Sequence, residues 1–198
     1  MIQWYSLALI AALFSATAAI LEKKILFKQK ALAMSTALAI FNLLLAIPFF
    51  FFISFASITS VSLGVLFFKS ILGAFAFLFV MLGIKNLEIS KALPLLVLTP
   101  GLVALFAFLI LGESLTLLQI LGLILLLIGT YVLQLKPKQK LFNTFKQALT
   151  SKGNHYIFFA LILFTITSIL DKALLKNFKL PINAFMGFQH LFLGIIFL

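Results

Sequence analysis

The amino-acid sequence predicts an all-α integral membrane protein, built as a polytopic bundle of transmembrane helices. Of its 198 residues, 64% are hydrophobic and 10% are charged, whereas soluble domains carry about 25% charged residues. The charges are also clustered, because uncharged runs such as 1–21, 31–68 and 114–135 separate short lysine-rich segments. A helix needs roughly 20 apolar residues to cross a bilayer. The chain is therefore predicted to be a multi-pass protein of a cell membrane, either a plasma membrane or a bacterial inner membrane.

Seven membrane-spanning segments are expected. A turn rich in serine and threonine at 54–62 divides the second span from the third, and Pro137, between two lysines, ends the fifth. A signal peptide that ends at the small residues 16–18 is an alternative for the first span, but no basic residue precedes that apolar run. The expected spans are 3–22, 32–54, 63–84, 90–111, 116–135, 154–175 and 181–198.

The sequence repeats itself across a polar, lysine-rich linker at 136–153. The run Ile20-Leu21-Glu22-Lys23 corresponds to Ile169-Leu170-Asp171-Lys172, and 42–47 corresponds to 190–195. The first unit, 1–135, contains five expected spans. Because five is odd, a second copy enters the membrane in the opposite orientation, which gives the inverted repeat common in secondary transporters. The second unit, 154–198, holds two spans, so we expect the chain to be a fragment of a ten-helix protein.

The composition argues against several other classes of protein. Cysteine is absent, which excludes disulfides and thiolate metal sites. The net charge of +11 comes from lysines in the loops, where they set topology and contact anionic lipids rather than nucleic acid. Neither a phosphate-binding loop nor a zinc-binding HExxH pair is present. We therefore expect no catalytic residues, no metal and no cofactor, while the oligomeric state is not indicated.

Three polar side chains inside apolar spans are candidates for a substrate cavity. Lys69 lies about two turns inside the third span, where an ammonium must either reach the interface or face a polar interior. Asn42 and His190 correspond to each other across the repeat. These two either line a cavity or form hydrogen bonds between helices.

The fourth span contains two prolines, Pro94 and Pro100. Each frees a backbone carbonyl four residues earlier, at Ser90 and Leu96, and such carbonyls need partners in lipid. The break therefore either faces a substrate beside Thr99 or bends the helix for structural reasons. We expect a cavity lined by parts of spans one, three, four and six. Its candidate residues are Lys69, Ser90, Pro94, Thr99, Pro100, Asn42 and His190.

The junction between the fourth and fifth spans is expected to be structural. Thr116 and Gln119 fit a capping box that begins the fifth helix. Glu113 lies beside that helix N-terminus, where the helix dipole favours a carboxylate, so we expect it to serve folding rather than binding. Gly122 and Gly129 lie seven residues apart on the fifth helix, a spacing typical of close helix–helix contact.

These motifs, in this order, resemble a known family. The stretch 83–94, then Thr99-Pro100, then 112–116 and 119–122, is similar to the EamA-type domain of the drug/metabolite transporter superfamily. The resemblance covers 1–135 and the start of a second copy at 154–198. It implies ten helices, arranged as two inverted five-helix repeats around a central substrate cavity.

The expected function is secondary transport of a small organic metabolite or drug by alternating access. Two alternatives from other classes stay open, namely a membrane-embedded enzyme and a non-transporting membrane assembly protein. The sequence does not identify the solute, and amino acids, nucleotide sugars, drugs and lipids are all compatible with it.

Overall fold

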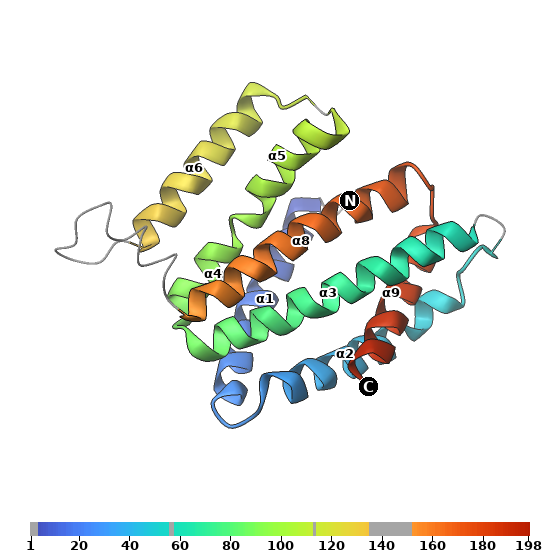
Figure 1. The fold of residues 1–198 in the computed structure, drawn as a ribbon, viewed down its shortest axis with the longest axis horizontal. Helices are drawn as coiled ribbons and strands as arrows, with labels where there is room; N and C mark the ends of the chain where they lie inside the picture. Colours follow the sequence, from blue (N-terminus) through green and yellow to red (C-terminus); the bar gives the residue numbers. More distant parts are fainter. Residues whose placement is uncertain (1–3, 56–57, 113, 135–151) are drawn as a thin grey trace.

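The computed structural model describes residues 4–55, 58–112, 114–134 and 152–198, and the regular elements in these ranges are all helices (Figure 1). The predicted all-α fold is confirmed. Glu113 and most of the linker, 135–151, lie outside the described residues. In chain order the helices are α1 (Trp4–Leu26), α2 (Ala31–Phe50), α3 (Ser60–Asn86), α4 (Ile89–Leu96), α5 (Thr99–Leu111), α6 (Leu117–Gln134), α8 (Lys152–Lys176) and α9 (Ile182–Phe197).

The described helices have the length and composition of membrane spans. Five segments are long and apolar enough to cross a bilayer: Tyr5–Leu26, Ala31–Phe50, Ser60–Asn86, Ala92–Ile110 and Asn154–Lys176. Two shorter apolar helices, Leu117–Leu133 and Ile182–Phe197, coincide with the other two expected spans. Large apolar side chains cover the outside of the bundle, including Phe14, Leu45 and Leu118. Such a surface suits lipid, since in water an apolar patch of this extent would associate.

The centre of the bundle is formed by α2, α3, α8 and α9. Helices α3 and α8 lie side by side and run in opposite directions, and α9 packs against α2 (Figure 1). Glycine permits the closest approaches. A Cβ added at Gly83 would overlap the side chain of Ile157, and one added at Gly194 would lie 2.9 Å from the Leu43 side chain. Small residues allow this close packing of helices in membranes.

Two apolar clusters fix the two ends of α3. One joins Met81 and Ile84 of α3 to Ile157 of α8, and the other joins Leu66 of α3 to Leu174 of α8. The stretch of α3 between the clusters contains Lys69, and the facing stretch of α8 contains Asp171. The packing therefore holds a polar segment between two apolar contacts.

A break divides the fourth expected span into α4 and α5. Pro94 lies within α4, and Pro100 lies in the first turn of α5. Pro100 cannot donate to the carbonyl oxygen of Leu96, but the Thr99 hydroxyl donates to that oxygen at 2.7 Å. The carbonyl that Pro100 frees is therefore satisfied by its own neighbour.

The next junction has the expected capping chemistry. Gly112 ends α5 with a φ of 64°, a left-handed conformation that favours glycine. The backbone N–H of Thr116 donates to Gln119 Oε1 at 2.9 Å, and the backbone N–H of Gln119 donates to Thr116 Oγ1 at 3.3 Å. These two bonds are the predicted capping box. Nothing in the described residues lies within 4 Å of a Cβ added at Gly122 or Gly129, so no described helix packs closely there.

Helix α1 is attached to the end of α3 by one side chain. Lys23 Nζ donates to the carbonyl oxygens of Ile84 at 2.5 Å, Lys85 at 3.1 Å and Leu87 at 2.7 Å. It also lies 5.0 Å from the ring centroid of Phe27. Carbonyls at a helix C-terminus have no partners within the helix, and a cation there is favoured by the dipole. Lys23 thus caps α3 from a neighbouring helix.

Candidate functional site

A cavity of about 250 Å³ lies between α2, α3, α8 and α9, and we call it the polar cavity. Its apolar lining includes the rings of Phe77, Phe164 and Phe197. Its polar lining is rich for a site within apolar helices and consists of Asn42, Lys69, Ser70, Thr167, Ser168, Asp171, Gln189 and His190.

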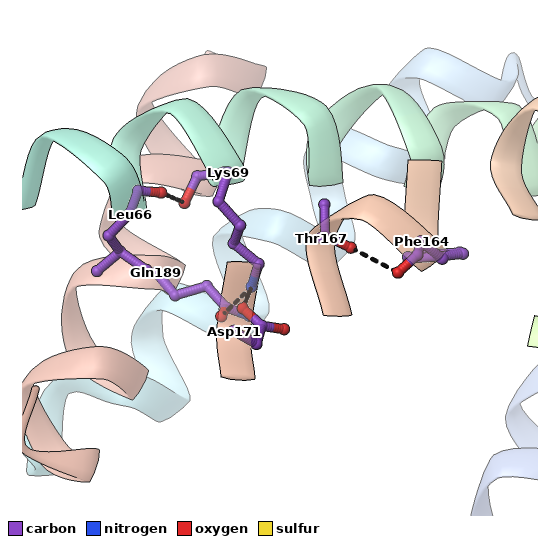
Figure 2. A network of polar contacts seen from close by, with 7 residues as sticks. Leu66, Lys69, Phe164, Thr167, Asp171 and Gln189 are labelled. Carbon is purple, nitrogen blue, oxygen red and sulfur yellow. Dashed lines mark hydrogen bonds and ion pairs between the residues drawn. The ribbon is translucent and has the colours of Figure 1, made fainter. Parts of the chain in front are cut away.

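The main polar contact in this cavity is an ion pair between two helices. Lys69 Nζ of α3 lies 2.7 Å from Asp171 Oδ1 of α8, and it donates a hydrogen bond of 2.6 Å to Gln189 Oε1 of α9. Figure 2 shows these three side chains pointing toward one another. The ring of Phe185 lies 5.0 Å from the same ammonium. Lys69 thus faces a polar interior and joins three helices, as a buried charge requires.

The two charged side chains differ in exposure. The side chain of Lys69 is 7% exposed, whereas that of Asp171 is 32% exposed and lines the cavity. His190 Nδ1 is buried without a hydrogen-bond partner in the described part of the chain. Because buried polar atoms are normally satisfied, this atom gives the cavity an unused capacity to bind a polar group.

The hydroxyl groups around the ion pair are mostly satisfied within their own helices. Ser70 Oγ donates to the carbonyl oxygen of Leu66 at 2.8 Å. Thr167 Oγ1 donates to the carbonyl oxygen of Phe164 at 3.1 Å (Figure 2). Serine and threonine form such bonds to the preceding helical turn. These hydroxyls therefore make the wall polar without competing for Lys69 or Asp171.

The structure brings three of the seven predicted cavity residues together. Lys69, Asn42 and His190 all line the polar cavity, and the last two are the residues that we expect to correspond across the predicted repeat. The cavity is thus lined by the second, third, sixth and seventh expected spans.

The other four predicted residues lie elsewhere. Ser90, Pro94, Thr99 and Pro100 belong to α4 and α5, which pack against α8 and do not contribute to the lining of the polar cavity. Ser90 and Pro100 are exposed, and Thr99 is bonded to Leu96. Their assignment to a substrate pathway stays a prediction.

Sequence reasoning did not identify Asp171 and Gln189 as site residues. A signal for Asp171 was present, because Lys69 within a span needs a counter-charge and the chain has only four acidic residues. Gln189 gave a weaker signal, as a polar residue beside His190 in an apolar run. Neither signal specifies which helices are neighbours.

The described residues contain no group of three or more histidine, cysteine, aspartate or glutamate side chains placed to hold a metal. The lining of the polar cavity contains one ammonium, one carboxylate, amide groups and an imidazole, surrounded by apolar side chains. This chemistry suits reversible binding of a polar organic molecule.

Comparison with known proteins identifies the family. No curated protein and no solved structure matches the chain. A model of the EamA-like transporter family matches residues 2–135, which is more than half of the 198 residues. The multi-pass helical fold agrees with this match. The chain therefore belongs to the EamA-like transporter family, whose members are membrane transporters of the drug/metabolite superfamily rather than enzymes.

Proposed function

We propose that this protein moves a small organic solute across the membrane by alternating access and that the polar cavity is its binding site. The observation that carries this proposal is the Lys69–Asp171 ion pair, which lies within apolar helices and beside a cavity. A buried ion pair is often no more stable than an apolar pair of similar volume. Ionisable residues inside a membrane therefore favour a functional role, most often along a solute pathway.

The position of the ion pair suggests how binding is linked to movement. Lys69 belongs to the first predicted repeat, whereas Asp171 and Gln189 belong to the second. A solute that takes over one of these contacts weakens the connection between the repeats. Because a ligand shifts a conformational equilibrium only through its different affinity for the two states, a contact that exists in one state and breaks in the other is a suitable control point. In this proposal the two repeats then rock around the bound solute.

Transport by the reconstituted full chain tests this proposal. Proteoliposomes are incubated with a mixture of cellular metabolites, and the entrapped solutes are identified by mass spectrometry against empty vesicles. The matched variant combines Lys69→Met with Asp171→Leu, so that no unpaired charge remains. We expect at least one solute to enter vesicles that contain the wild type and to be excluded by the double variant at equal protein content. Entry equal to that of empty vesicles, or unchanged entry with the double variant, would contradict the proposal.

A further inference from the structure

We propose that one end of the helix bundle is a docking surface for the anionic phospholipid headgroups of the cytoplasmic leaflet, so that α1 begins on the opposite side of the membrane. We call this the lysine-rich end, and it comprises the α1–α2 turn at 27–30, the α3–α4 turn at 87–88 and the first turn of α8. These segments meet because Lys23 contacts the end of α3, which also packs against Ile157 near the start of α8 (Figure 1). The surface lies outside the polar cavity, and its lipid contacts do not depend on transport.

The lysines are distributed unevenly between the two ends of the bundle. The α2–α3 turn at the opposite end, 51–59, contains no charged residue, and the α8–α9 region there contains Lys172, Lys176 and Lys179. Eleven of the fifteen lysines belong to the sequence segments that meet at the lysine-rich end, including the linker that leads into α8: Lys23, Lys24, Lys28, Lys30, Lys85, Lys91, Lys136, Lys138, Lys140, Lys146 and Lys152. The acids beside them are Glu22 and Glu88, so a large positive excess remains.

Two of these lysines build the surface, and others are exposed on it. Lys23 caps α3, and Lys85 Nζ donates to the carbonyl oxygen of Gln29 at 2.8 Å. These contacts join the α1–α2 turn to the end of α3 in both directions. The exposed side chains around that turn are Lys24, Lys28 and Lys30. Their ammonium groups are therefore carried by a braced turn and can contact phosphate groups outside the bundle.

An aromatic recess beside this end indicates its depth in the membrane. The recess has a volume of about 310 Å³ and is lined by Phe79, His155, Tyr156 and Phe159. Phe79 precedes Asn86, the last residue of α3, by seven residues, which corresponds to roughly 10 Å along a helix. Tyrosine is favoured at such a depth, because its ring lies among acyl chains while its hydroxyl reaches the headgroups. The recess thus offers space for the upper part of an acyl chain below the exposed lysines.

The chemistry of this end matches one leaflet of the membrane. Lysines near the ends of transmembrane helices are retained on the cytoplasmic side. Anionic lipids give the surface of that leaflet a negative potential, which attracts each nearby lysine. The lysine-rich end therefore fits the cytoplasmic leaflet, and the end that carries the uncharged α2–α3 turn fits the other leaflet.

Single cysteines at the two ends test the orientation. Gln29→Cys lies in the α1–α2 turn and Asn177→Cys in the α8–α9 turn, and both positions are exposed. The full chain is expressed in the inner membrane of a bacterium, and spheroplasts receive a membrane-impermeant maleimide before or after permeabilisation. We expect Asn177→Cys to be labelled in intact spheroplasts and Gln29→Cys to be labelled only after permeabilisation. The reverse pattern, or equal labelling of both positions in intact spheroplasts, would overturn the proposal.

Thermal stabilisation of the purified full chain in non-ionic detergent tests the lipid contact. The ligands are phosphatidylglycerol, phosphatidylcholine with the same acyl chains, and the soluble headgroup analogue glycerol 3-phosphate. We expect phosphatidylglycerol to raise the melting temperature well above the effect of the other two. The triple variant Lys24→Gln, Lys28→Gln and Lys30→Gln should need more phosphatidylglycerol for half of the maximal shift, by about fivefold for each lysine removed.

A matched variant removes the same charge from the opposite end. The triple variant Lys172→Gln, Lys176→Gln and Lys179→Gln should need the same concentration of phosphatidylglycerol as the wild type. If the first triple variant fails to fold, Lys28→Gln alone should still show a shift of about fivefold. Equal stabilisation by phosphatidylglycerol and phosphatidylcholine, or an equal shift in the two triple variants, would overturn the docking surface. Equal stabilisation by glycerol 3-phosphate would also overturn it, because the surface would then bind phosphate groups in general rather than lipid.

Discussion

Asp171 of α8 approaches Lys69 of α3 to 2.7 Å, although the two residues lie on opposite sides of the polar linker at 136–153. The acid that we expect to correspond to it in the first predicted repeat, Glu22, lies on α1, and the lysine after it, Lys23, caps α3. The two acid–lysine sequences that we expect to be equivalent therefore have different roles in the two predicted repeats. In the first the lysine makes the structural contact, and in the second the acid makes the contact at the cavity.

Removing one member of the ion pair should destabilise the protein strongly, whereas replacing both members with apolar side chains should change its stability little. Lys69→Met leaves Asp171 without its counter-charge, so we expect a loss of stability on the order of 3 kcal/mol. The double variant Lys69→Met with Asp171→Leu should recover most of that loss, because no unpaired charge remains. Thermal unfolding of the purified protein in detergent, analysed as a double-mutant cycle, measures the coupling. Additive effects of the two substitutions would show that the residues do not interact.

The close contact between α3 and α8 gives a second prediction. A methyl group at position 83 overlaps the Ile157 side chain, so Gly83→Ala should destabilise the protein by roughly 1–3 kcal/mol. Gly64→Ala is the matched control on the same helix, since nothing lies within 4 Å of a Cβ there. The control should be neutral or slightly stabilising, because alanine favours a helix more than glycine does. Melting temperatures of both variants check this expectation, and rescue of Gly83→Ala by Ile157→Ala, which removes both side-chain atoms that the added methyl group overlaps, would confirm the contact. Equal melting temperatures for Gly83→Ala and Gly64→Ala would contradict it.

The attachment of α1 to α3 gives a third prediction. Lys23→Met removes the donor to three carbonyl oxygens at the end of α3, and hydrogen bonds from a charged donor contribute about 1.5–3 kcal/mol. We expect a loss within that range, measured as a lower melting temperature in detergent. The control is Lys24→Met, which removes the neighbouring exposed lysine and should have little effect. An equal loss in the two variants would mean that charge near the interface, rather than the carbonyl contacts, determines stability.

Much of the fold was predictable because it depends on local sequence. The length of the apolar runs identified the spans, and Thr116 with Gln119 identified a cap from residues three apart. The site was only partly predictable. Lys69 was identified from its depth in a span, but its partner Asp171 depends on which helices are neighbours, and hydrophobicity does not encode that. Pro100 correctly indicated a free carbonyl, but the sequence did not show that Thr99 satisfies it.

The last prediction concerns which helices face the solute pathway. The chain has no cysteine, so single cysteines can be introduced without background labelling. Ser168 lines the polar cavity, Thr99 lies at the break before α5, and Leu125 of α6 is 69% exposed on the apolar surface.

Thiol reagents react with the thiolate, which forms in water rather than in lipid. A membrane-impermeant reagent should therefore label Ser168→Cys faster than Leu125→Cys, and a transported solute should protect the former. Because Thr99 does not line the polar cavity, we expect Thr99→Cys to label as slowly as Leu125→Cys. Fast labelling of Thr99→Cys that the solute prevents would instead place α5 on the pathway, as the proline pattern alone suggested. Solute-insensitive labelling of all three positions would remove the polar cavity from consideration as the binding site.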